Sequence, residues 1–194
     1  MTRVGLIRHG VTYWNKEGRT QGHSHNELDE EGIAQAHRLA ERLSGEDWTV
    51  IVSSDLRRAR QTAEIIRGRL GIAIAGLDER LRELGRGQVE GYTEEERVER
   101  WGAGWRQMNL GLESGAAGGE RGSCCIRELA RKYAGEKILV VSHGAVLRHS
   151  LNRLISGLPT GDPLNNTSLT ILKHAEGDQW ECELYNCTRH LKAW

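Results

Sequence analysis

The sequence lacks both a long hydrophobic run and an excess of charge of either sign. Its 194 residues include 27 Lys and Arg against 27 Asp and Glu, which gives a formal net charge of zero. A zero net charge excludes the global basic field by which many proteins attract nucleic acid. No segment approaches membrane-spanning length, and the N-terminus lacks the apolar core of a signal peptide. We therefore expect a cytoplasmic protein that binds neither nucleic acid nor membranes.

Cysteine is scarce and phenylalanine is absent. In a chain without a secretion signal the four cysteines are expected to be free thiols, and neighbours such as Cys124 and Cys125 rarely bridge each other. Together with His23 and His25 they match no standard spacing of zinc ligands, so we expect no metal site. We have no physical account of the missing phenylalanine beside six tryptophans.

Two histidines occupy nearly identical positions in the sequence. His9 lies in Val4–Gly10 and His143 in Ile138–Gly144, and each follows a short aliphatic run and precedes a glycine. Such runs are typical of buried parallel strands. Because ligands of open α/β sheets bind beyond the carboxyl ends of the strands, the two imidazoles can meet in one pocket, with Arg8 beside the first.

Hydrophobic periodicity predicts alternating strands and helices, and hence an α/β fold. Gly10–Asp29 is a long polar loop, and loops of this length are usually functional. A glycine-rich loop is expected at Gly111–Gly122, followed by a short helix at Cys125–Tyr133. The expected strands are Val4–Arg8, Thr49–Val52, Ile72–Leu77, Lys137–Val141, Thr167–Leu172 and Trp180–Tyr185. The other expected helices are Glu31–Leu43, Leu56–Leu70, one between His143 and Gly157, and one opened by a Thr93 capping box with Trp101, Trp105 and Met108 on its apolar face.

Five motifs that follow one another along the chain resemble those of the histidine phosphatase superfamily, the phosphoglycerate mutase-like proteins, and most closely its short bacterial phosphatase branch. The resemblance implies a three-layer α/β/α sandwich with a mostly parallel sheet, helices on both faces and a small helical cap. It implies a single domain over residues 1–194, with the cap around residues 85–125. The motifs are RHGVTYWN at Arg8–Asn15, RTQG at Arg19–Gly22, SSDLRRARQTAE at Ser53–Glu64, LRELGRGQVEGYT at Leu81–Thr93 and VVSHGAVLR at Val140–Arg148.

The resemblance assigns the nucleophile and the phosphate clamp. His9 is expected to attack phosphorus through one ring nitrogen, while the other donates its proton to a backbone acceptor. Arg8 and Arg58 are expected to hold phosphate oxygens, because guanidinium offers a matching fork of donors. Arg57 and Arg60 compete with Arg58, but only Arg58 matches the position of the motif.

Four further residues complete the expected site. His143 is expected to be a second phosphate ligand that donates to the developing charge. Asn15 and Gln21 suit contacts with phosphate oxygens, although such residues also favour loop structure. The backbone N–H of Gly144 is expected to face the anion as well.

Glu83 is the expected general acid. It would give a proton to the leaving oxygen and then remove one from the attacking water. Glu79, Glu90 and the run Glu94–Glu96 are alternatives, and the run is better explained as negative charge at a helix N-terminus. Glu83 matches the position of the family's acid, shortly before a Glu-Gly pair.

The superfamily contains phosphatases and cofactor-dependent phosphoglycerate mutases, and the length of this chain favours the phosphatase. The mutases that it resembles carry longer insertions and a C-terminal tail over the site, whereas only Thr188–Trp194 follows the last expected strand. A phosphohistidine that water can reach should hydrolyse. We therefore expect a metal-independent phosphomonoesterase that needs no cofactor and acts on small phosphorylated metabolites. The alternatives are the mutase and a non-catalytic module that binds phosphorylated ligands.

The sequence leaves two features undetermined, the structure of one segment and the oligomeric state. Gly111–Cys125 departs from the family pattern, and we expect it to be shortened or remodelled, which leaves the choice of substrate undetermined. The strand expected at Ile72–Leu77 lies at a sheet edge and can pair with a second copy, so both a monomer and a homodimer are compatible with the sequence.

Overall fold

The computed structural model of the chain describes residues 1–192 and contains one six-stranded sheet. Its strands are β1 (Thr2–Arg8), β2 (Val50–Ser53), β3 (Ala73–Leu77), β4 (Lys137–Ser142), β5 (Leu169–Ala175) and β6 (Gln179–Cys187). Their order across the sheet is β3-β2-β4-β1-β5-β6. β1 to β4 pair in parallel, whereas β5 and β6 join antiparallel. The last two positions of the C-terminal tail, Ala193 and Trp194, lie outside the described residues.

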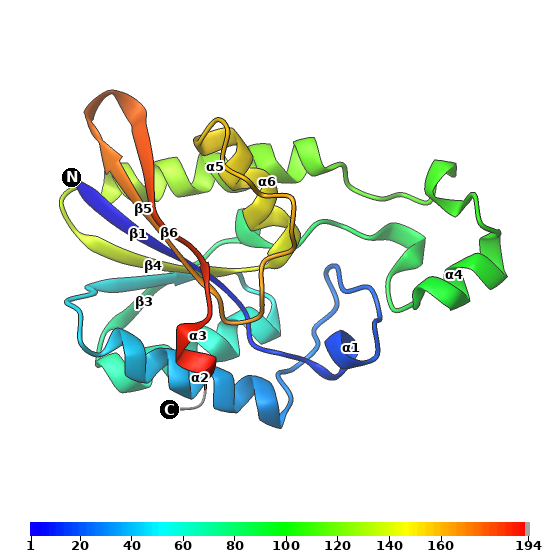
Figure 1. The fold of residues 1–194 in the computed structure, drawn as a ribbon, viewed down its shortest axis with the longest axis horizontal. Coiled ribbons are helices and arrows are strands. Elements are labelled where there is room, and N and C mark those ends of the chain that lie inside the picture. The colour runs from blue at the N-terminus through cyan, green and yellow to red at the C-terminus, as the bar shows by residue number, and fades with distance from the viewer. Residues whose placement is uncertain (193–194) are drawn as a thin grey trace.

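Helices cover both faces of this sheet (Figure 1). α2 (Glu30–Leu43) and α3 (Arg57–Leu70) lie on one face, and α5 (Gly115–Lys132) and α6 (Gly144–Leu154) lie on the other. Neighbouring side chains of β1 alternate between the two layers, as a strand requires. Leu6 packs in the buried cluster with α5 and α6, and Ile7 packs in the cluster with α2 and α3. The predicted three-layer α/β/α sandwich is confirmed.

α5 contradicts the prediction for the segment before β4. The expected loop at Gly111–Gly122 and the short helix at Cys125–Tyr133 are wrong, because one 18-residue helix occupies most of both. The side chain of Ser114 caps this helix by accepting the N–H of Ala117 at 3.1 Å. The helix before β4 is therefore long, contrary to the expectation of a short one.

Two glycines of α5 allow this helix to pack closely against α6, a role that the sequence alone does not reveal. A Cβ built at Gly119 would lie 3.0 Å from the backbone oxygen of His149, and one at Gly122 would lie 2.3 Å from Ser150 Oγ. Both partners belong to α6. Glycine is thus present where two helices approach closely, and tertiary packing overrides its low helix propensity.

The helical cap projects to one side of the sheet (Figure 1), around α4 (Glu94–Trp101). The capping box at Thr93 is confirmed. Gly102, with φ of 81°, ends the helix, so the predicted apolar stripe does not continue through Trp105 as α-helix. The cap has a small hydrophobic cluster of its own, made of Val89, Trp105, Leu110 and the partly buried Trp101.

The remaining elements agree with the sequence within a few residues. β3 lies at a sheet edge, as predicted. A short helix, α1 (Tyr13–Lys16), lies inside the long polar loop and was not predicted. Within residues 1–192, no helix has the length and apolar character needed to cross a membrane. Short 3₁₀ segments occur at Glu79–Leu81, Gly87–Val89, Trp105–Gln107, Glu176–Asp178 and Arg189–Leu191.

Candidate active site

The two histidines meet at the carboxyl ends of neighbouring strands. β1 and β4 pair with Arg8 opposite Ser142, so the residues that follow, His9 and His143, leave the sheet side by side. Their ring centroids are 5.2 Å apart. The prediction that parallel strands bring both imidazoles to one place is confirmed.

The hydrogen bonds of His9 fix which nitrogen is free to react. Nδ1 lies 2.7 Å from the backbone oxygen of Gly10, which can only accept, so Nδ1 carries the proton. Arg58 Nε donates to Nε2 at 3.3 Å, which requires a lone pair on that nitrogen. Burial, together with Arg58 and Arg8, holds the pKa of His9 well below its usual value. His9 is therefore a neutral imidazole with Nε2 unprotonated.

Arg58 is fully buried beneath the loop between β1 and α2. Its Nη1 and Nη2 donate to the backbone oxygens of Ser24 and Gly22, each at 2.8 Å. Burial lowers its pKa to about 10, so it stays charged at neutral pH. The competing arginines form exposed ion pairs, Arg57 with Glu27 and Arg60 with Glu64, as the sequence indicated.

Arg8 and His143 each keep a polar atom without a partner in the described chain. Arg8 donates from Nη1 to the backbone oxygen of Leu164, while its Nε is buried and unpaired within residues 1–192. His143 Nε2 lies 2.8 Å from Ser54 Oγ, and its Nδ1 is also unpaired there. Burial and the nearby Arg58 lower the pKa of His143 well below its usual value. The imidazole is therefore neutral in the ligand-free chain and can donate through one nitrogen only.

Gly144 begins α6 directly beside Arg8. A Cβ at this position would lie 3.2 Å from Arg8 Nε, so glycine leaves room for the guanidinium. The expected contact of its N–H with an anion remains a prediction.

Glu83 connects the site to the N-terminus of α6. Its carboxylate accepts the backbone N–H groups of Leu84, Ala145 and Val146 at 2.8, 3.0 and 3.0 Å. Glu83 is buried, with 8% of its surface exposed.

The alternative acids are occupied elsewhere. Glu90 accepts the backbone N–H groups of Gly22 and Ser24, and so stabilises the loop that holds Arg58. Glu79 is an exposed partner of Arg82, and the run Glu94–Glu96 forms the first turn of α4.

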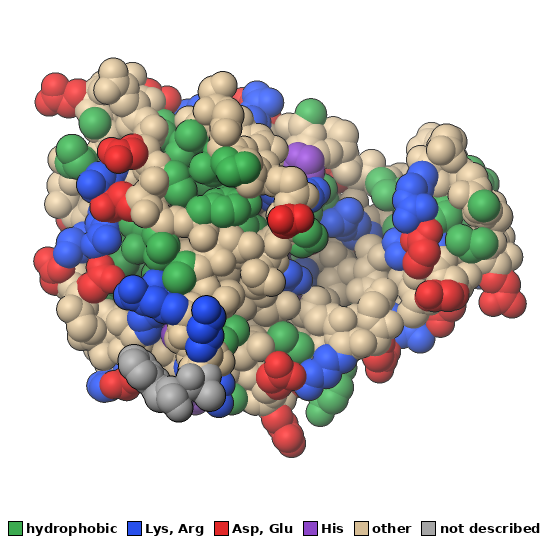
Figure 2. All heavy atoms as spheres, in the orientation of Figure 1, with side chains coloured by type: hydrophobic (Ala, Val, Ile, Leu, Met, Phe, Trp, Pro, Cys, Tyr) green, Lys and Arg blue, Asp and Glu red, His purple; other side chains and the backbone are tan. Residues whose placement is uncertain are grey.

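A cavity of about 280 Å³ opens between the sheet and the cap. Figure 2 shows this region as a hollow with Lys and Arg side chains on its wall. Of the predicted site residues, Arg8, His9, Asn15, Gln21, Arg58 and Glu83 line it, whereas His143 and Gly144 are not part of the lining. The side-chain oxygens of Asn15 and Gln21 lie 3.1 and 3.0 Å from the Thr12 hydroxyl oxygen, whose single proton they share. The complete lining is Arg8, His9, Asn15, Arg19, Thr20, Gln21, Arg58, Glu83, Arg86, Val89, Arg97, Trp105 and Leu112.

Sequence reasoning missed two groups of residues at this site. The first supports the nucleophile: Asn166 Nδ2 donates to the backbone oxygen of His9 at 3.0 Å, and the N–H of Thr167 donates to that of Arg8 at 2.9 Å. Nothing in a polar loop far along the chain signals such contacts. The second group is Arg86, Arg97 and Leu112 in the cavity lining. Arg86 belongs to the motif at Leu81–Thr93, where its charge was a usable signal. Trp105, which the sequence offered as a residue at the mouth of the site but more readily as core, both lines the cavity and packs in the cap cluster.

The residues considered for zinc do not assemble. Among residues 1–192, no group of three or more His, Cys, Asp or Glu side chains is placed to hold a metal ion. His23 Nε2 instead lies 2.8 Å from the backbone oxygen of Glu83. The four cysteines are free thiols, as predicted.

Known proteins resemble this chain over nearly its whole length. A profile of the histidine phosphatase superfamily (branch 1) matches residues 4–188. The chain is 37% identical to the probable phosphoglycerate mutase GpmB of Yersinia pestis, over 98% of this chain and 95% of that protein. It is 34% identical to the uncharacterized phosphatase PhoE of Bacillus subtilis, over 98% of this chain and 97% of that protein.

Solved structures show the same similarity. YhfR of Bacillus stearothermophilus superposes with a TM-score of 0.88 at 30% identity, over 99% of this chain and all of the other. A phosphoserine phosphatase mutant of Entamoeba histolytica in complex with phosphoserine has a TM-score of 0.82 at 30% identity, over the same shares.

Proposed function

The chain belongs to the histidine phosphatase superfamily (branch 1) and is an enzyme of the histidine phosphatase type, and from that premise we propose its reaction. It is a metal-independent phosphomonoesterase that acts on small phosphorylated metabolites through a phosphohistidine at His9. The state of His9 is the observation that carries the proposal. Its imidazole is neutral, Nδ1–H donates a hydrogen bond to the backbone oxygen of Gly10, and the unprotonated Nε2 lies 3.3 Å from Arg58 Nε on the cavity wall.

The first step transfers the phosphoryl group to the enzyme. His9 Nε2 attacks phosphorus, an N–P bond forms, and the P–O bond to the leaving group breaks. The leaving oxygen takes a proton from Glu83. Glu83 must therefore carry that proton before the P–O bond breaks.

The second step returns the enzyme to its starting state. A water gives a proton to Glu83 while its oxygen attacks phosphorus. The N–P bond breaks, the electron pair returns to Nε2, and inorganic phosphate leaves. Arg8, Arg58 and His143 stabilise the charge on the phosphoryl oxygens in both steps. Arg8 Nε, which has no partner within residues 1–192, is a donor suited to this task, and His143 Nδ1 is one as well when the Ser54 hydroxyl donates to Nε2.

The competing reaction is a phosphoglycerate mutase, which the similarity to GpmB favours. In a mutase the phosphohistidine would transfer its phosphoryl group back to a sugar acid before water arrives. The cavity is a surface hollow in this chain (Figure 2), and water access supports hydrolysis.

Several expectations from the sequence stay with this proposal. We propose that residues 1–194 form one domain with a cap around residues 85–125, and that the enzyme works in the cytoplasm without a cofactor. Asn15, Gln21 and Gly144 are proposed as further phosphate contacts. The proposed function is compatible both with a monomer and with a homodimer that pairs through the β3 edge.

The test is phosphate release from a panel of phosphomonoesters in EDTA, with wild type beside His9→Ala. Release that survives EDTA and is lost in the variant supports the proposal. If no ester is hydrolysed, transfer between phosphoglycerates with added bisphosphoglycerate identifies a mutase. If neither phosphate release nor transfer is detected, the remaining explanation is a module that only binds phosphorylated ligands.

A further inference from the structure

Arg86 is a charged residue of the cavity that the phosphatase chemistry does not use. It is partly buried and lines the cavity three residues beyond Glu83. Its Nε is buried and has no hydrogen-bond partner within residues 1–192. A buried guanidinium nitrogen without an acceptor is costly, so its retention points to an anionic partner that arrives with the ligand.

Each of the other arginines of the cavity has a partner in the chain or is assigned to the phosphoryl group. Arg58 donates to two backbone oxygens, Arg19 pairs with Glu96 at 2.7 Å, and Arg97 pairs with Glu94 at 3.2 Å. The unpaired Nε of Arg8 is the proposed donor to the phosphoryl group, so Arg86 is the cavity arginine that is left for a second anion.

The surroundings of Arg86 hold its stem, and the nearby Glu113 is already paired with another arginine. Its Cγ would lie 2.9 Å from a Cβ at Gly22, so the stem packs against the loop whose carbonyl accepts from Arg58. Glu113, which accepts the N–H of Gly85, is already paired with Arg121 at 2.8 Å.

The position of Arg86 in the cavity points to one part of the substrate, the leaving group. Since Glu83 protonates the leaving oxygen, the rest of the leaving group extends along the Glu83 side of the cavity. Arg86 lines the same cavity as Glu83, together with the apolar side chains of Val89, Trp105 and Leu112, which can cover a short carbon skeleton.

We propose that Arg86 binds a second anionic group on the leaving group, so that the enzyme selects phosphomonoesters that also carry a carboxylate or a second phosphate. This inference rests on the proposed phosphatase function. Guanidinium binds both groups through paired N–H donors, and the substrate pairs of the experiment distinguish them.

The experiment compares substrates that differ only in the second anion. The carboxylate pair is 3-phosphoglycerate and glycerol 3-phosphate, and the phosphate pair is fructose 1,6-bisphosphate and fructose 6-phosphate. For each pair the ratio of kcat/KM values is measured in wild type, Arg86→Ala and Arg86→Lys. We expect one ratio to fall about 10- to 100-fold in Arg86→Ala, the value of a charge-assisted hydrogen bond, and to fall less in Arg86→Lys.

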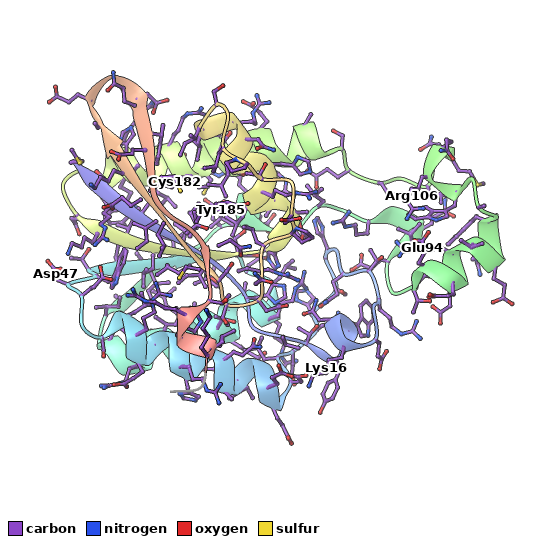
Figure 3. The ribbon with its side chains drawn as sticks, in the orientation of Figure 1. Lys16, Asp47, Glu94, Arg106, Cys182 and Tyr185 are labelled. Atoms are coloured by element: carbon purple, nitrogen blue, oxygen red, sulfur yellow. The ribbon has the colours of Figure 1, made fainter. Side chains whose placement is uncertain are left out.

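Arg106→Ala is the matched control. Arg106 also belongs to the cap, where it lies beside Glu94 (Figure 3) and pairs with it at 2.9 Å. Its guanidinium stacks on the Trp105 ring, but its side chain is 59% exposed and lies outside the cavity lining. Its ratios should equal those of wild type.

The outcomes test the role of Arg86 and the proposed phosphatase function separately. A change in the carboxylate pair or in the phosphate pair supports the inference and names the group. Equal loss on both members of each pair in Arg86→Ala, or no preference in wild type, overturns it while phosphate release still supports the phosphatase. No phosphate release from any ester by wild type overturns the proposed function itself.

Discussion

Glu83 joins the cavity to the N-terminus of α6, because two of the backbone N–H groups that it accepts belong to that helix. If it is the general acid, Glu83→Gln should lower kcat on an alkyl phosphate about 10²- to 10⁴-fold. The loss should be smaller on p-nitrophenyl phosphate, whose leaving group needs no proton. Glu79→Gln, a change at an exposed ion pair, should leave both rates unaltered. A near-native rate of Glu83→Gln on the alkyl ester would exclude the assignment.

Burial of His9 and His143 also makes stability depend on pH. Both have a lowered pKa in the folded chain, whereas the unfolded chain titrates near 6.5. As pH falls below that value, only the unfolded state gains these protons, so the free energy of unfolding decreases. We expect a loss of about 2 to 3 kcal/mol between pH 7.5 and pH 5.5 by urea denaturation, from two groups at about 1.4 kcal/mol per unit. The double variant His9→Gln and His143→Gln should show a flatter profile; an unchanged slope would contradict this account.

The sequence predicted the grouping of the proposed site residues far better than it predicted their supports. His9, Arg8, Arg58 and His143 follow or flank predicted strands, so the topology of a parallel sheet is enough to bring them together. The supporting Asn166 is more than 150 positions away from His9 and acts through one hydrogen bond to the backbone. No local pattern encodes such a contact, because it exists only once the chain has folded.

Among the elements, α5 shows where sequence prediction fails. Clustered glycines indicate a loop when only local propensity is considered. Here they lie in a helix that approaches α6 closely, and the partner helix cannot be inferred from the segment itself. The boundaries of β1, β2 and β4 were predicted within a few residues because buried aliphatic runs mark them directly.

This explanation of α5 predicts opposite effects for two Gly-to-Ala changes. Gly119→Ala should lower the free energy of unfolding by about 1 to 3 kcal/mol, because its Cβ would press on the backbone of His149, which cannot swing away. Gly68→Ala, in the exposed part of α3 with open space around it, should raise stability by about 0.5 to 1 kcal/mol. Chemical denaturation of both variants measures this. Equal effects of the two changes would show that α5 is not packed as described.

At the scale of the whole molecule, the cap has its own small cluster apart from the two clusters of the sheet. Trp105→Ala should therefore loosen the cap locally, with faster proteolysis between residues 94 and 112 and a raised KM, while the thermal midpoint changes little. Trp48→Ala removes a side chain from the main core and should instead cost about 3 to 5 kcal/mol of global stability. A large fall of the midpoint in Trp105→Ala would mean that cap and body unfold together.

The central claim is a covalent phosphohistidine at His9, and the most direct measurement is rapid quenching in base during turnover, followed by mass spectrometry of the peptides. We predict one phosphate on His9 that is stable in base and lost in acid, and none on the corresponding peptide of His9→Ala. In Glu83→Gln the phosphohistidine should form slowly if the first step depends more on the acid. It should accumulate if the second step, its hydrolysis, depends more on Glu83. A phosphate on a serine or cysteine, or full turnover with no phosphorylated His9 at any time point, would contradict the account.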